Sequence, residues 1–266
     1  MSKTILITGA GSGLGKGTAL GLAKKGHQVI AGVMQWEQVT ALRAEAQQAQ
    51  VSDKLRVIKL DITDAMDCQH AQSYDIDILV NNAGIGETGP LAEIPVHLLR
   101  KVMETNVFAT LELTQAFIKK MVANKQGKIV FVSSMAGLST YPFLGPYNAS
   151  KHALEAVAQC LRDELKPLGI TVATINPGPY RTGFNDRMYE SAHQWFDAAK
   201  HFTPEQPLRD IQGGLASPES QYDPQEMIAK MIEVIPAEQH LFRTMLPAAV
   251  EQWCKEYQQN QWTIEV

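Results

Sequence analysis

The residues best suited to chemistry lie between Ser134 and Lys151. This stretch ends in YNASK, which places Tyr147 four positions before Lys151. In the first turn of a helix, the two side chains would project from the same face. A nearby ammonium lowers the pKa of a tyrosine from about 10 towards working pH, and such a tyrosine can exchange a proton with an alcohol or ketone oxygen. Because Y-x-x-x-K is also an ordinary start of an amphipathic helix, its meaning depends on the rest of the chain.

A glycine-rich turn follows the first predicted strand. The run KTILIT at 3–8 is typical of a buried strand, and it leads through GAGSGLG at 9–15 into a helical pattern. Such a unit seats a nucleotide phosphate on the N-terminus of the helix, where backbone N–H groups and the helix dipole favour negative charge. The residues expected to approach a dinucleotide here are Gly9, Ser12, Gly13, Leu14 and Gly15.

The sequence leaves the choice between NAD and NADP open. A carboxylate for the ribose 2′-hydroxyl normally stands at the end of the second strand of such a unit. That place holds Val33 and Met34, which offer neither a carboxylate nor a cation for a 2′-phosphate. Ser12, inside the glycine turn, adds no positive charge either.

Small and polar residues follow the later predicted strands. Asp61 follows LRVIKL and would either accept from an adenine amine or cap the next helix, and NNAG at 81–84 would let a cofactor ring lie close or form a plain turn. Six strands alternating with helices predict an α/β fold with a doubly wound parallel sheet. Since ligands bind at the carboxyl edge of such sheets, we expect these turns to gather there.

Two further segments bear on the site. The helical pattern over 95–124 is broken near Asn106, which the pattern alone would place at the surface. The segment 179–218 lacks strand signals, follows a strand and is rich in aromatic residues. We interpret it as a lid over the site, within a single domain spanning 1–266.

Composition narrows the class of protein. The chain has 266 residues, 45% of them apolar, and a net charge of −4, which gives no basic footprint for nucleic acid. Its three widely spaced cysteines argue against a disulfide framework, and no apolar run is long enough for a membrane span. We expect a soluble, cytoplasmic protein. His193 and His201 have no third ligand nearby and are interpreted as packing residues, so no metal site is expected.

Taken together, these motifs resemble the short-chain dehydrogenase/reductase family in its compact form, from Lys3 to about Thr182. The glycine turn matches its T-G-x-x-x-G-x-G, NNAG its second signature, and Y-x-x-x-K its catalytic pair, with Ser134 thirteen residues before Tyr147. The resemblance implies a Rossmann-type sheet in strand order 3-2-1-4-5-6-7, with helices on both faces. It also implies hydride exchange between NAD or NADP and a carbinol or carbonyl carbon, in a homodimer or homotetramer.

The resemblance also implies roles for single residues. Tyr147 would be the general acid/base, Ser134 would hydrogen-bond the substrate oxygen, and Lys151 would lower the pKa of Tyr147 and hold the nicotinamide ribose. Asn106 would support a water relay for protons. The full set of implied cofactor contacts is Gly9, Ser12, Gly13, Leu14, Gly15, Asp61, Ile62, Asn82, Ala83, Gly84, Tyr147, Lys151, Pro177, Gly178 and Thr182.

The substrate is predicted from the lid and from the segment before Tyr147. The long aromatic lid and the tail look like the branch of the family that handles apolar alcohols, so we expect an apolar secondary alcohol or ketone. Phe184 and Trp195 of the lid would then supply the pocket, although the lid aromatics could equally pack the lid itself. The predicted substrate contacts are Ser134, Leu138, Tyr141, Phe143 and Tyr147.

Two other functions are compatible with the sequence. A carrier-dependent reductase of 3-oxoacyl thioesters would need a basic docking patch, to which Arg181 and Arg187 could contribute. A regulatory protein that senses NAD(P) without turnover would keep the glycine turn. Such a sensor has no need of Ser134, Tyr147 and Lys151 together.

Overall fold

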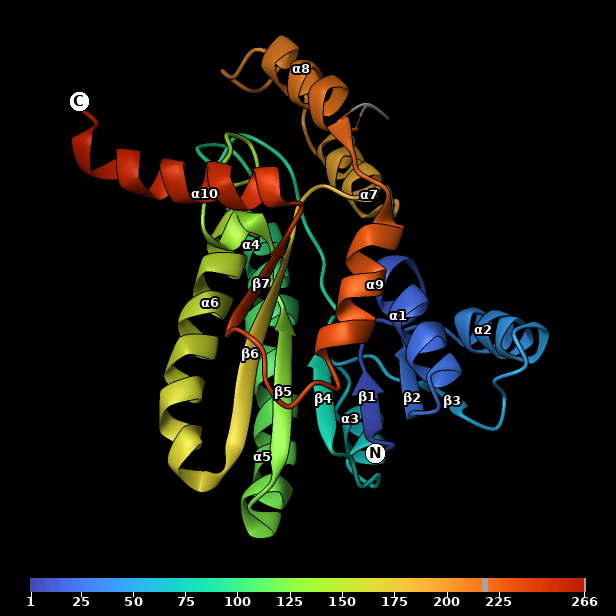
Figure 1. Cartoon of the computed structure of the whole chain (residues 1–266). Helices are drawn as coiled ribbons and strands as arrows, with labels where there is room; N and C mark the ends of the chain where they lie inside the picture. Colours follow the sequence, from blue (N-terminus) through green and yellow to red (C-terminus); the bar gives the residue numbers. More distant parts are fainter. Residues whose placement is uncertain (217–219, 266) are drawn as a thin grey trace.

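Parallel strands form one sheet in the order β3-β2-β1-β4-β5-β6-β7 (Figure 1). The structure is a computed structural model that describes residues 1–216 and 220–265. The order confirms the predicted Rossmann-type fold, and it reverses between β1 and β4, where ligands of such sheets bind. The strands are β1 (Thr4–Ile7), β2 (Gln28–Val33), β3 (Leu55–Lys59), β4 (Ile78–Asn81), β5 (Gly127–Val132), β6 (Ile170–Pro177) and β7 (Arg243–Leu246).

Helices cover both faces of the sheet. One face carries α1 (Gly13–Lys24), α2 (Trp36–Gln48) and α9 (Pro224–Val234). The opposite face carries α3 (Ala65–Ala71), α5 (Thr110–Asn124) and α6 (Gly145–Leu165). The helices α7, α8 and α10 lie beyond the carboxyl ends of the strands (Figure 1). Within the described residues, no helix combines the length and apolarity that crossing a membrane requires.

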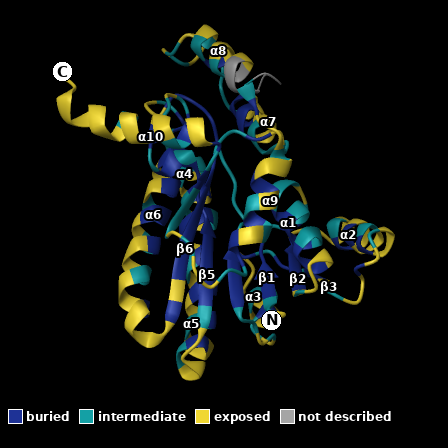
Figure 2. Ribbon diagram, in the orientation of Figure 1, coloured by how far each residue is buried: buried dark blue, intermediate teal, exposed yellow. Residues whose placement is uncertain are grey.

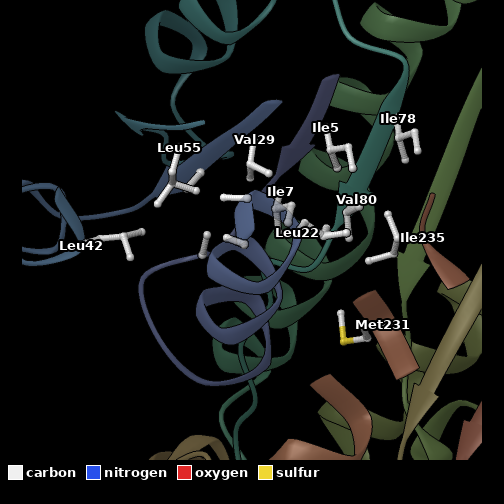
Figure 3. Close-up of a cluster of buried hydrophobic side chains, with 14 of the residues drawn as sticks. Ile5, Ile7, Leu22, Val29, Leu42, Leu55, Ile78, Val80, Met231 and Ile235 are labelled. Atoms are coloured by element: carbon white, nitrogen blue, oxygen red, sulfur yellow. The ribbon is translucent and has the colours of Figure 1, made fainter. Parts of the chain in front are cut away.

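Two hydrophobic clusters join these layers. The strands are nearly continuous β-branched runs because both of their faces are buried, as Figure 2 shows by the dark sheet between paler helices. Figure 3 shows the cluster under α1 and α9, where Ile5 and Ile7 meet Leu22 and Met231. The other cluster centres on Phe117 and Phe131, both almost fully buried. The layers thus hold the strand ends at fixed positions.

The helical region over 95–124 is built from three pieces. They are α4 (Val96–Met103), a π-helical turn η1 (Glu104–Ala109) and α5. Asn106 lies in the π turn and is 1% exposed, so its expected place at the surface is wrong. The widened turn carries its amide inward, and such turns are frequent at functional sites.

The predicted lid (179–218) contains α7 (Phe184–Glu190), the 3-10 turn η4 (Ser191–Gln194) and α8 (Glu205–Ala216). Its residues 217 and 218 lie outside the described residues. The seventh strand of the order that the family resemblance implies is β7, which pairs with β6. It continues into α10 (Ala248–Asn260), and the remaining short turns are η2 (Met135–Gly137), η3 (Lys166–Leu168) and η6 (Gln261–Thr263).

Candidate active site

A cavity of about 830 Å³ opens at the carboxyl edge of the sheet. The turns after β1, β3, β4, β5 and β6 all line it, together with α7 and α10. Each residue expected to contact the cofactor lies on this cavity, so segments far apart in the sequence meet at one place. That gathering follows from the parallel sheet, whose strand ends share one edge.

The glycine turn is shaped for a bound phosphate. Gly9 and Gly13 have φ of +64° and +53°, and a Cβ at Gly15 would lie 2.4 Å from the amide nitrogen of Asn82. Ser12 stands at the N-cap of α1 without a side-chain capping hydrogen bond, and the first turn contains no acidic residue. The backbone N–H groups of this turn therefore have no side-chain acceptor, which fits a pyrophosphate bound at the helix N-terminus.

Thr8 and Asn82 lock the glycine turn to the end of β4. The Thr8 hydroxyl accepts hydrogen bonds from the backbone N–H groups of Asn82 and Ala83, both at 3.0 Å. The Asn82 amide donates to the carbonyl oxygens of Thr8 and Gly9 at 2.9 and 3.0 Å. Asn82 thus binds the turn rather than facing a ligand as a free amide, which explains why an amide stands at this strand end.

Of the described residues, none with a basic side chain lines the cavity near the end of β2, where the adenosine ribose is expected. Met34 and Gln38 line it, and Val33 is fully buried behind them. Lys16, one helical turn after Ser12, forms a salt bridge with Glu45, in which the ammonium nitrogen lies 2.9 Å from the carboxylate oxygen. Among the described residues that line the cavity, only Lys151 and Arg187 are basic, and both belong to its other end. The structure therefore keeps the choice between NAD and NADP open, and it adds Gln38, which the sequence gave no reason to select.

Asp61 lines the cavity without capping the helix that follows it. Its carboxylate accepts from the backbone N–H and the hydroxyl of Thr63, at 2.9 and 2.7 Å. Asp64 caps α3 instead, by accepting from the N–H groups of Met66 and Asp67. Of the two interpretations of Asp61, the helix cap is thus wrong.

Tyr147 and Lys151 stand one turn apart at the start of α6. Pro146 lies in the first turn of this helix. Backbone N–H groups there have no acceptor within the helix, so the missing N–H of proline costs no hydrogen bond. The Lys151 ammonium donates to the carbonyl oxygen of Val132 at 2.9 Å and lies 5.6 Å from the centroid of the Tyr147 ring. Ser134 follows β5 and lines the same end of the cavity. The three side chains are buried together.

Burial dominates the ionisation of this pair. Desolvation raises the pKa of Tyr147 to about 12, while a hydrogen bond with Ser134 acts in the opposite direction. Desolvation lowers the pKa of Lys151 to about 8, and the carboxylate of Glu155 acts to raise it. The pKa of Tyr147 is therefore raised overall, because the cost of burying a phenolate is larger than the contributions that lower it; that Lys151 lowers this pKa stays a prediction.

Asn106 clamps the backbone that follows NNAG. Its amide oxygen accepts from the N–H of Ile85 at 2.9 Å, and its amide nitrogen donates to the carbonyl oxygen of Ile85 at 2.8 Å and to the Ser150 hydroxyl at 2.9 Å. Ser150 in turn donates to the carbonyl oxygen of Tyr147 at 2.8 Å. Both amide hydrogens are thus in use, so the Asn106 side chain has no donor left for a water relay.

The substrate end of the cavity is mainly apolar. Tyr141 lines it as expected, but the expectation for Leu138, Phe143 and Trp195 is wrong. Leu138 packs instead on the cluster of Met245, Val250 and Cys254. Phe143 adopts a left-handed conformation with φ of +65°, and its carbonyl oxygen accepts from the N–H of Gly89.

Trp195 belongs to a separate aromatic group within the lid, formed with Phe196 and His201. A Cβ at Gly89 would lie 2.1 Å from its ring, and the ring meets Phe196 and His201 edge-on. His201 stacks on Phe196 with the ring centroids 5.0 Å apart. This group packs the lid, whereas Phe184 lines the cavity and lies 5.5 Å from the Tyr147 ring. Phe184 therefore fits the interpretation that lid aromatics line the pocket, whereas Trp195 fits the interpretation that they pack the lid itself.

Sequence reasoning missed several cavity residues. Trp253 comes from α10, more than seventy residues beyond the last matched motif, and stacks on Tyr141 with ring centroids 5.3 Å apart. A tryptophan on the inner face of an otherwise polar terminal helix was the available signal. The segment Met135 to Pro146, predicted as one wall of the substrate pocket, contributes Met135, Ala136, Tyr141 and Leu144 to the lining, whereas Ile85 and Asn185 were not selected from the sequence.

Comparison with known proteins agrees with this geometry. The sequence profile described as short chain dehydrogenase matches residues 3–193. The chain belongs to this family. A relative in Bacillus subtilis (strain 168), named "Uncharacterized oxidoreductase YusZ", is 35% identical over 255 residues, which cover 92% of this chain and 88% of that protein.

Two further proteins extend the comparison. The "NADPH-dependent 3-dehydrocapnine reductase" of Ornithobacterium rhinotracheale is 36% identical over 189 residues, covering 66% of this chain and 65% of that protein. A short-chain dehydrogenase from Streptomyces avermitilis has a TM-score of 0.82 at 25% identity, covering 99% of this chain and 94% of that one. At the level of the family, the prediction of an oxidoreductase that uses NAD or NADP is confirmed.

Proposed function

We propose that this short-chain dehydrogenase reduces an apolar ketone, or oxidises the corresponding secondary alcohol. One observation carries the proposal: Tyr147 lines the cavity and packs among mainly apolar side chains that line it too. The apolar lining includes Met135, Leu144, Phe184, Met188, Tyr189 and Trp253. Burial of an apolar substrate body there would be favourable by about 25 cal/mol per Å² of apolar surface.

The proposed chemistry needs a proton at oxygen and a hydride at carbon. When bound, the nicotinamide ring supplies or accepts the hydride. Tyr147 gives its hydroxyl proton to the carbonyl oxygen as that oxygen gains negative charge, or takes the proton back in the reverse direction. Ser134 donates a second hydrogen bond to the same oxygen, which stabilises the developing charge.

Lys151 and Asn106 would support this proton transfer in different ways. The Lys151 ammonium would bind the nicotinamide ribose and stabilise the phenolate that Tyr147 becomes. Asn106 would fix the backbone of Ile85 and, through Ser150, that of Tyr147, so that the reacting groups keep their geometry. Because its amide is fully engaged, this positioning replaces the side-chain water relay in our proposal.

The ionisation of Tyr147 defines its form at neutral pH. A phenol whose pKa is raised to about 12 stays protonated there, so it can donate to a ketone. Oxidation of an alcohol would first require the phenolate, which burial disfavours and a charged Lys151 would stabilise.

The proposal is tested with the purified protein and a graded panel of ketones. Titration with NADH and NADPH selects the cofactor, and kcat/KM is then measured from the cofactor absorbance for aliphatic, aromatic and polycyclic ketones. We expect kcat/KM to rise with the apolar surface of the ketone. Turnover confined to small hydrophilic ketones would contradict the apolar pocket.

A second candidate is the reduction of 3-oxoacyl thioesters. Arg187 lies on the cavity beside the apolar end, where it could pair with a phosphate of a carrier arm. A solved structure of actinorhodin polyketide ketoreductase with NADPH has a TM-score of 0.76 at 25% identity. A kcat/KM for a 3-oxoacyl thioester above that of every free ketone, lost in Arg187→Gln, would favour this candidate.

Three broader features are part of the same proposal. The segment 179–218 would act as a lid in a single catalytic domain, because α7 contributes Phe184 and Met188 to the cavity. The chain would form a homodimer or homotetramer through α5 and α6, beside which Phe108 is 52% exposed. A cytoplasmic location suits its three free cysteines. Light scattering after size exclusion would test the assembly.

A further inference from the structure

A buried acid lies one helical turn beyond Lys151. Glu155 is 3% exposed and follows Tyr147 and Lys151 along α6 at the same four-residue spacing, so all three side chains share one face of the helix. The proposed proton transfer makes no use of it. Burying a carboxylate is costly unless it is paired and hydrogen-bonded, so its partners need an explanation.

Asn176 holds one oxygen of this carboxylate. It lies near the end of β6, is fully buried, and its amide nitrogen donates to Glu155 Oε1 at 2.6 Å. The same nitrogen donates to the carbonyl oxygen of Ser134 at 3.0 Å. The carboxylate is therefore fixed relative to the segment that carries Ser134, on one side of the reaction site.

Arg243 holds the other oxygen from the edge strand β7. Its guanidinium donates to Glu155 Oε2 at 2.6 Å and lies 5.5 Å from the centroid of the Phe242 ring. The Arg243 side chain is 33% exposed, so this positive charge is partly hydrated, whereas the carboxylate is not. Charges of alternating sign thus follow one another from the partly exposed Arg243, through the buried Glu155, to the buried Lys151 one helical turn away.

We propose that Glu155 is a positioning residue of the reaction site: its carboxylate, fixed by Asn176 and Arg243, keeps the buried ammonium of Lys151 in its charged form. The proposal rests on the proposed function, in which a charged Lys151 binds the cofactor ribose and stabilises the phenolate of Tyr147. An ammonium that bonds only to the carbonyl oxygen of Val132 would otherwise lose its proton easily in this desolvated place.

Other charges around Lys151 are remote from it or already paired. On its own helix, the buried ionisable neighbours of Lys151 are Tyr147 and Glu155. The elements β6 and η2, which pack on this helix, contain no ionisable side chain. Glu87, in the loop after β4, pairs with Lys101 at 2.9 Å. The remaining ionisable groups of α4 and η1, which pack on α6, are exposed: His97, Arg100 and Glu104. Glu155 is thus the buried negative charge that acts on Lys151, in accord with the direction in which it moves the pKa of that lysine.

The test measures how the affinity for the reduced cofactor depends on pH, by nicotinamide fluorescence in the whole chain; NADH is used here, or NADPH where titration selects it. In the native protein, affinity should fall as Lys151 loses its proton, near its pKa of about 8. In Glu155→Gln, the fall should move by about one pH unit to lower pH, because the charge that supports the ammonium is gone. Glu164→Gln, an exposed change on the same helix, should keep the native profile.

Arg243→Met should shift the pH dependence of cofactor affinity in the opposite direction. It removes the positive charge, while the amide of Asn176 still donates to the carboxylate and favours its ionised form. The fall in affinity should therefore move to higher pH. A role limited to packing would shift both variants in the same direction or neither. A native profile in a folded Glu155→Gln protein would overturn the proposal, and if that variant does not fold, a native profile in Arg243→Met would do so.

The readout separates this proposal from the proposed reaction. Opposite shifts in NADH affinity would support the line of charges even if no ketone were reduced, and the proposed reaction alone would then fail. If apolar ketones are reduced but the pH dependence of cofactor affinity is the same in the variants as in the native protein, the proposed reaction is supported and the role of Glu155 is overturned. Where turnover is found, the decrease of kcat at high pH should shift in the same directions, to lower pH in Glu155→Gln and to higher pH in Arg243→Met.

Discussion

The two walls of the cavity are held by different kinds of contact. The wall made by the strand ends and α6 is fixed by hydrogen bonds between buried polar groups, such as those of Asn106 and Asn82. The wall made by α7 and α10 is fixed mainly by apolar and aromatic contacts, such as Tyr141 on Trp253. Hydrogen bonds demand one geometry, whereas apolar contacts tolerate changes of shape.

This difference assigns different tasks to the two walls. The hydrogen-bonded wall holds the groups that must meet the reacting oxygen, where a displacement of about 1 Å can cost about a hundredfold in rate. The apolar wall touches only the body of the substrate, where the loss of a methylene changes discrimination by about 1–3 kcal/mol. Substitutions in the first wall should therefore reduce kcat, and those in the second should change KM.

The largest effect is expected for Tyr147→Phe in the hydrogen-bonded wall. Loss of the hydroxyl removes the proton donor, so kcat for ketone reduction should fall by about 10²–10⁴. Affinity for NADH should stay near the native value, since the ring and its packing on Phe184 remain. A variant that kept full ketone-reducing activity would refute the role of Tyr147.

The next effect is expected for Asn106→Ala. The change leaves the N–H and C=O of Ile85 without their partners inside the protein, which should lower the free energy of unfolding by about 1–3 kcal/mol. Urea unfolding measures this loss, and kcat should fall because the backbone of Tyr147 is no longer fixed through Ser150. Asn124→Ala, an exposed change at the end of α5, serves as the control. Equal stability of the two variants would contradict the proposed clamp.

The apolar wall should respond in KM. Trp253→Ala or Phe184→Ala should raise KM for an apolar ketone about tenfold and change kcat little, because each removes about 1–2 kcal/mol of substrate burial. Trp195→Ala should leave KM unchanged, since that ring packs the lid outside the cavity. Trp262→Ala, at a site 91% exposed, is the control. A larger rise for Trp195→Ala than for Trp253→Ala would reverse the assignment of the lid aromatics.

The same division explains what the sequence could predict. Strand ends, the glycine turn and Tyr147 with Lys151 follow from local patterns, because a parallel sheet brings its strand ends together whatever the loops do. Asn106 was misplaced because a π turn changes which face an α-helical pattern buries. Leu138 and Trp253 depend on how α10 docks, and Glu155 on its contact with β7; no local pattern encodes such long-range contacts.

The smallest effect is expected outside both walls, at the contact of Glu93 with the lid. Its carboxylate accepts hydrogen bonds from the backbone N–H groups of Phe202 and Thr203, at 2.8 and 2.9 Å. These bonds connect the lid to the loop before α4. Burial acts to raise the pKa of Glu93, but hydrogen bonds from Thr203 and Phe202 outweigh it and hold that pKa below its usual value. As the pH falls through this lowered value, the carboxylate takes up a proton and the tie weakens.

Hydrogen exchange can measure this tie directly. In Glu93→Gln, the amides of Phe202 and Thr203 should exchange about fivefold faster at neutral pH, because a single amide oxygen replaces two carboxylate oxygens. The native protein should show the same loss of protection only in acid, after correction for the intrinsic exchange rate. Glu190→Gln, an exposed change on α7, should leave both amides protected. Because the tie lies outside the cavity, KM should change by less than about twofold, and a change as large as that of Trp253→Ala would mean that lid position, and not only the shape of the apolar wall, determines substrate binding.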